Sequence, residues 1–126
     1  MKSVNKIFIS FVILAFTYAC KKGGTGGNTN IVTIVSHHGK AIKNARVFIK
    51  YGAYNFPGID TTIYNSKQLS GADGYTNFKN LKPGYYFCYA IGYDSTSATQ
   101  VSGNAGLKIK QKDKGSELEL RISVSE

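Results

Sequence analysis

The stretch Glu117-Leu118-Glu119-Leu120-Arg121-Ile122-Ser123-Val124 alternates between polar and apolar residues. This period of two residues is typical of a β-strand with one face in a core and the other in water. Seven segments upstream are short and mostly rich in β-branched or aromatic residues, with turn residues between them. We therefore expect strands at residues 31–36, 45–51, 60–65, 75–79, 85–93, 98–101, 107–111 and 117–124.

These segments predict an all-β fold, an antiparallel β-sandwich of seven to eight strands. A parallel sheet would need crossover helices, and the chain has neither the length nor the helical periodicity for them. We expect the sandwich domain to occupy residues 31–126 of the 126-residue chain.

The amino-terminal residues 1–19 have the layout of a secretory signal peptide, with a basic start, an apolar run and a small residue at the end. Cys20 follows directly, and this arrangement resembles the lipobox of bacterial lipoproteins. The resemblance implies cleavage before Cys20, lipid on its thiol and attachment to a membrane. The alternative is an ordinary secretory leader followed by an incidental cysteine. Residues 20–30 are rich in glycine and polar residues, which predicts a flexible tether.

The charge of the exported chain is strongly positive. Without Lys2 and Lys6, fourteen basic residues face seven acidic ones, a net charge of +7. This balance favours anionic partners such as acidic glycans or lipid phosphates. We expect no nucleic-acid partner, because the sequence contains no recognisable nucleic-acid-binding motif.

Several turn-based motifs resemble carboxypeptidase regulatory-like domains. The residues that carry this resemblance are Gly39–Val47, Ala72–Phe78, Leu81–Tyr86 and Ala90–Tyr93, which follow one another in the order and spacing of that family. Ala41 and Asn44 depart from the proline and glycine that the family has at those positions. The resemblance implies a transthyretin-like (prealbumin-like) sandwich that holds no active site, with Phe78, Leu81 and Tyr86 in the core.

The sequence offers little for catalysis or metal binding. His37 and His38 are neighbours in a predicted solvated turn, and too few other ligands exist for a metal site. Cys88 lies in an apolar run and is expected to be a buried, unreactive thiol. No hydrolase motif or carboxylate pair is recognisable, so we expect no enzyme, no metal and no cofactor.

Two sets of residues remain as candidate binding surfaces. If Tyr86 points inward, then Tyr85, Phe87 and Tyr89 point outward, and Tyr54 and Phe56 from the loop 51–59 extend the aromatic stripe. The alternative is that neighbouring side chains or this loop cover the stripe and make it a second small core. Lys108, Lys110, Lys112 and Lys114 are spaced by two residues and are expected on one face of a strand and its turn. They would bind lipid phosphates or acidic polysaccharide, or alternatively protect a sheet edge from aggregation.

Together these features predict a non-catalytic envelope lipoprotein whose β-sandwich binds a protein or glycan. The alternative function is a structural accessory subunit of an envelope assembly or surface appendage, joined by strand addition. The expected location is the outer membrane, facing the periplasm, because Lys21 and Lys22 depart from the acidic signal for surface export. The cell surface is the alternative location. The sequence does not indicate an oligomeric state.

Overall fold

The structure, a computed structural model, describes residues 23–126. The predicted signal peptide, residues 1–19, and the predicted lipidation site, Cys20, lie outside the described residues. Within residues 23–126, no helix is both long enough and apolar enough to cross a membrane.

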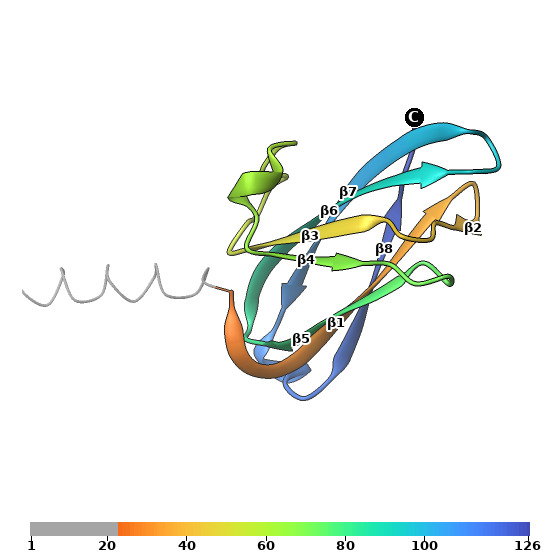
Figure 1. Ribbon diagram of the computed structural model, residues 1–126. Helices are drawn as coiled ribbons and strands as arrows, with labels where there is room; N and C mark the ends of the chain where they lie inside the picture. The colour runs from red at the N-terminus through yellow and green to blue at the C-terminus, as the bar shows by residue number, and fades with distance from the viewer. Residues whose placement is uncertain (1–22) are drawn as a thin grey trace, which may run out of the picture.

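Eight strands and two short 3-10 helices make up the described chain (Figure 1). In chain order they are β1 (Thr25–His37), β2 (Lys40–Ala41), β3 (Arg46–Tyr51), η2 (Thr61–Ile63), β4 (Ser66–Leu69), β5 (Tyr75–Leu81), β6 (Gly84–Asp94), β7 (Thr99–Ile109), η3 (Gln111–Asp113) and β8 (Glu117–Ser123).

The strands form two sheets of four strands each, which confirms the predicted all-β sandwich. In the first sheet, β1 pairs with β2, β5 and β8. The second sheet has the order β4-β3-β6-β7 and is antiparallel throughout. Figure 1 shows the β3–β4 connection standing off one end of the second sheet, with the β6–β7 turn and β2 at the other end.

One pairing differs from the prediction of a wholly antiparallel sandwich. β8 runs parallel to β1, from Asn30 opposite Glu117 to Ser36 opposite Ser123. No crossover helix is needed, because the chain between β1 and β8 passes through the second sheet before it returns. A parallel pair can therefore form although the described chain has no crossover helix.

Two local predictions also differ from the structure. Residues 60–65 are not a strand, because Asp60 accepts a hydrogen bond from the backbone N–H of Thr62 and starts the turn η2. The strand that follows, β4, pairs with β3 instead. The two weak strands predicted at residues 98–101 and 107–111 are one strand, β7, which pairs with β6 along its whole length.

The glycine-rich residues 25–30 are part of strand β1 and not of a flexible tether, which corrects the predicted domain boundary at residue 31. Thr29 is fully buried, and Thr25 and Thr29 both pair with Leu81 around an irregularity in the strand. Glycine permits this close approach, because a Cβ on Gly27 would lie 2.1 Å from the carbonyl oxygen of Leu81. The folded domain thus begins before residue 31.

The core lies between the two sheets and contains the side chains that the alternation places inward. Tyr86, Phe78 and Leu81 are buried as expected. Cys88 is also buried, and burial raises the pKa of its thiol to about 12, so the thiol stays protonated and unreactive. The other core residues are Ile31, Val35, Ile42, Ala45, Val47, Ile49, Ala90, Val101, Ile109, Leu120, Ile122 and Val124.

Candidate functional site

The aromatic stripe on the outer face of β6 is oriented as predicted, but the β3–β4 loop covers it. Phe56 packs against the rings of Phe87 and Tyr89, at centroid distances of 6.1 and 5.5 Å. Tyr64 stacks on Tyr89 at 6.1 Å. Tyr89 is consequently only 7% exposed, and this part of the sheet forms a second small core, the alternative named above.

Tyr54, at one end of this aromatic cluster, remains exposed to solvent. Tyr54 packs edge-on against Tyr85 at 5.0 Å and is itself 68% exposed. Partial burial of Tyr64 raises the pKa of its phenol to about 12, and its hydroxyl donates to the carbonyl of Gly58 within the same loop. The loop is thus held by its own contacts as well as by the sheet.

The four lysines were expected on one face of a strand and its following turn, and three of them lie in that turn. Strand β7 ends at Ile109, and Lys110 and Lys112 belong to the turn around η3, with Lys114 as its last flanking residue. Lys108 alone lies in the strand, with its ammonium 5.1 Å from the ring centroid of Tyr85. All four lysines are exposed, and none of them forms an ion pair within residues 23–126.

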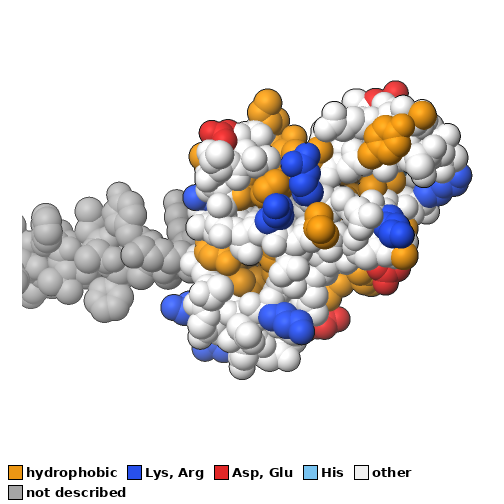
Figure 2. Space-filling model, in the orientation of Figure 1, with side chains coloured by type: hydrophobic (Ala, Val, Ile, Leu, Met, Phe, Trp, Pro, Cys, Tyr) orange, Lys and Arg blue, Asp and Glu red, His pale blue; other side chains and the backbone are white. Residues whose placement is uncertain are grey.

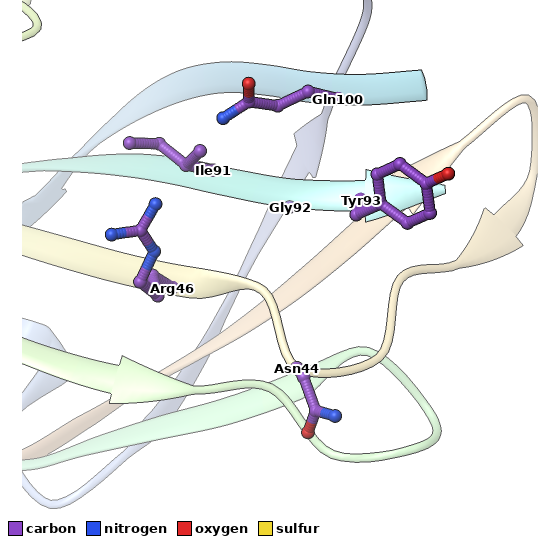
Figure 3. A pocket seen from close by; sticks show the side chains of 6 residues that line it. All are labelled: Asn44, Arg46, Ile91, Gly92, Tyr93 and Gln100. Atoms are coloured by element: carbon purple, nitrogen blue, oxygen red, sulfur yellow. The ribbon is translucent and has the colours of Figure 1, made fainter. Parts of the chain in front are cut away.

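The β3–β4 loop does not cover the end of the second sheet at which Tyr93 lies. This end forms a shallow hollow of about 430 Å³. In Figure 3 its side chains come from three adjacent strands and the turn before β3, with the Arg46 guanidinium turned toward Ile91. Tyr93 is 58% exposed, and Gln100 lies directly opposite it on β7. The full lining is Asn44, Arg46, Ile91, Gly92, Tyr93 and Gln100.

A second hollow, of about 400 Å³, shares Asn44 and Tyr93 with the first. It adds Lys40 and Lys43, both exposed, and the turn that follows β6. We call the two hollows together the Tyr93 groove. The groove thus combines one exposed aromatic ring with amide, hydroxyl and cationic side chains around it.

A buried serine fixes the segment that forms one wall of the Tyr93 groove. The Ser70 hydroxyl donates to the carbonyl of Ile42 at 2.6 Å and accepts from the N–H of Ala45 at 2.8 Å. The Ser70 backbone bonds to Asn44 and Ala45 as well. Four hydrogen bonds thus hold the turn that precedes Arg46, and a site held in this way loses little conformational entropy on binding.

Two backbone features let this wall pack against β6. Asn44 has a φ of 58°, a left-handed conformation that asparagine adopts more readily than most residues. Gly92 on β6 leaves room for this wall, because a Cβ at position 92 would lie 2.8 Å from Ile42 and 3.2 Å from Ala45.

A buried hydrogen-bonded pair supports the opposite wall. His37 lies in β1 and is 2% exposed, with its Nδ1 atom 2.6 Å from Oδ2 of Asp94 at the end of β6. The other carboxylate oxygen accepts from the N–H of Thr96 at 2.9 Å. The prediction of a solvated turn is therefore wrong for His37, although His38 is exposed. The hydrogen bond from His37 lowers the pKa of Asp94 below its ordinary value of 3.8, and the Thr96 N–H adds to this against the opposing effect of burial.

This pair predicts an acid-sensitive contribution to stability. Because the folded-state pKa of Asp94 is depressed, its stabilisation is fully present above pH 3.8 and is lost as the pH falls through the lower folded-state value. Chemical unfolding at a series of pH values should show a steeper loss of stability below pH 3.8 for the natural protein than for Asp94→Asn. Equal slopes in the two proteins would refute the assignment, and His37→Gln should also flatten the slope.

The Tyr93 groove was not identified from the sequence, although one signal pointed to it. The alternation along β6 that turns Tyr85, Phe87 and Tyr89 outward also turns Tyr93 outward. No sequence signal indicates that the loop stops short of Tyr93, or that Arg46 and Gln100 flank it. Among residues 23–126, no three His, Cys, Asp or Glu residues come together as a metal site.

Figure 2 shows one face of the molecule, on which Lys and Arg side chains lie between exposed hydrophobic ones and the acidic side chains lie toward the margins. Within residues 23–126, the ion pairs are His37–Asp94 and Arg121–Glu119, so neither Arg46 nor the lysines are neutralised by an acidic partner there.

Comparison with known proteins identifies the fold and no family. No family model and no curated protein matches the chain, so the carboxypeptidase regulatory-like family remains a resemblance. A candidate carbohydrate-binding protein of Pseudomonas aeruginosa matches with a TM-score of 0.52 and 10% identity, over 84% of this chain and 93% of its own. The major pilin subunit of Bacillus cereus matches with a TM-score of 0.45 and 16% identity, over 79% of this chain and 30% of its own. The two sheets show that the chain is a β-sandwich, and the likeness to the Pseudomonas protein agrees with this fold.

Proposed function

We propose that this chain is a non-catalytic lipoprotein of the cell envelope whose β-sandwich binds a glycan in the Tyr93 groove. The observation that carries the proposal is the exposed ring of Tyr93 beside Asn44, Arg46 and Gln100. An aromatic face stacks on the apolar face of a sugar ring, and amide and guanidinium groups bond to its hydroxyl groups. The description of the Pseudomonas neighbour as a candidate carbohydrate-binding protein agrees with this, although the likeness itself concerns only the fold.

The position of the groove suits a protein anchored at Cys20. Gly24, whose backbone N–H bonds to Tyr86, lies four positions after Cys20, so the chain between them spans at most about 14 Å. A Cβ on Gly23 would lie 3.0 Å from the carbonyl of Tyr85, so the anchored end of the domain is the Tyr85 end of β6. Tyr93 lies eight residues further along this strand, roughly 26 Å away. The groove would thus stay clear of the membrane surface.

Binding to a glycan array tests the proposal. The full-length protein, extracted from membranes in mild detergent, is applied to immobilised oligomers of neutral hexoses, N-acetylhexosamines and uronic acids. We expect retention on at least one class, and Tyr93→Ala should weaken it roughly tenfold, equivalent to about 1.4 kcal/mol. Tyr75→Ala is the matched control, because Tyr75 is an exposed tyrosine on the other sheet. Absence of retention on every class, with the fold intact by circular dichroism, would refute the proposal.

The second candidate function is a structural subunit of an envelope assembly, joined by strand addition. The outer edge of β7 favours it, because within residues 23–126 the pairing on that side is limited to the bridge between Ser102 and Ser125. A protein partner cross-linked equally to the natural protein and to Tyr93→Ala would support this second function.

A further inference from the structure

The charges around the Tyr93 groove point to the class of glycan that it would bind. Lys40, Lys43 and Arg46 all line the groove and are all exposed. Within the described chain, none of the three forms an ion pair. Their charges are therefore free to attract an anionic ligand.

The acidic residue in the lining does not cancel this charge. Asp94 lines the second hollow, but its two carboxylate oxygens are already bonded to His37 and to the N–H of Thr96. The carboxylate is also largely buried. The lining thus carries three exposed positive charges against one carboxylate that is buried and hydrogen-bonded.

The arrangement of the cations favours a polymer over a single small anion. Arg46 lines the first hollow, Lys40 and Lys43 line the second, and Tyr93 lies in both. Arg46 lies opposite Ile91 and is therefore the diagonal neighbour of Tyr93, about 7–8 Å away across the sheet. A ligand that stacks on Tyr93 and reaches all three cations must therefore extend on both sides of the ring.

We propose that the ligand of the Tyr93 groove is an acidic polysaccharide, with one sugar ring stacked on Tyr93 and uronate carboxylates of neighbouring sugars bound by Arg46, Lys43 and Lys40. This inference rests on the proposed function, because it names the ligand class of the same site. Guanidinium bonds a carboxylate through two parallel N–H groups, whereas each ammonium acts as a point charge. Arg46 would thus set the position of the chain, and the lysines would mainly add attraction that salt screens.

Two ligands that differ only at their carboxyl groups test the inference. Isothermal titration of the full-length protein in detergent compares a polygalacturonate oligomer with the same oligomer after reduction of its carboxyl groups to alcohols. We expect the acidic oligomer to bind at least roughly tenfold more tightly at low ionic strength, and the difference to shrink as salt is added. The triple variant Lys40→Gln, Lys43→Gln, Arg46→Gln should lose this preference.

A control of equal charge separates a local site from general attraction. Lys79→Gln, Lys112→Gln, Arg121→Gln removes three exposed charges outside the groove lining and should keep the preference for the acidic oligomer. Equal affinity for the two oligomers, or equal loss in both triple variants, would overturn this inference and leave glycan binding intact. Binding of neither oligomer, together with an empty glycan array, would instead overturn the proposed function.

Discussion

Tyr89→Ala is expected to lower the free energy of unfolding by about 3–5 kcal/mol, the usual effect of removing a buried aromatic side chain. Tyr89 is 7% exposed and lies between the rings of Phe56 and Tyr64, on the outer face of the second sheet. The substitution would leave a cavity under the β3–β4 loop and remove two aromatic contacts. A domain of this size has a total stability of about 5–15 kcal/mol, so the effect would be a large fraction of it.

Urea unfolding measures this effect, with Tyr54→Ala as the matched control. Tyr54 belongs to the same aromatic cluster but is 68% exposed, and its single ring contact with Tyr85 is worth about 0.5–1.5 kcal/mol. If Tyr89→Ala cost no more than Tyr54→Ala, the loop would not cover the stripe. The stripe would then again be a candidate binding surface.

Tyr86→Phe is expected to lower the free energy of unfolding by about 1–3 kcal/mol, although it removes a single oxygen atom. The Tyr86 hydroxyl accepts from the N–H of Gly24 at 2.8 Å and lies 2.5 Å from the carbonyl of Lys82 and 3.1 Å from that of Gly24. Phenylalanine fills the same space but leaves these backbone groups without their partner. The cost is that of polar groups left unsatisfied in a part-buried site.

Amide hydrogen exchange shows where the effect of Tyr86→Phe is located. Exchange should accelerate most at Gly24 and in the first residues of β1, because the hydroxyl joins this segment to β6. Tyr75→Phe is the control, since Tyr75 is exposed. Unchanged exchange in Tyr86→Phe would mean that the glycine-rich segment is not held by this hydroxyl and that the predicted tether extends further into the chain.

The alternation of residues predicted the strands well but not their partners. Period two is a local property, so it placed Leu120 and Ile122 inside and put Tyr86 on the same face as Cys88, without any knowledge of the neighbouring strands. The parallel pairing of β8 with β1 depends on where a distant strand returns, and no local pattern records that. The burial of His37 likewise depends on Asp94, which is 57 residues away along the chain.

The sequence by itself determined that Tyr85, Phe87, Tyr89 and Tyr93 share one face of β6, because alternation needs only the extended backbone of one strand. The resemblance to carboxypeptidase regulatory-like domains implied that this face points outward. Only the tertiary structure decided which of these outward residues can bind a ligand. The loop between β3 and β4 folds back over Phe87 and Tyr89 and ends before Tyr93, while the Ser70 hydrogen bonds bring Asn44 and Arg46 to the uncovered end. Exposure depends on the long-range packing of a loop whose own residues carry no periodic signal, and for this reason the candidate site became visible only in the folded chain.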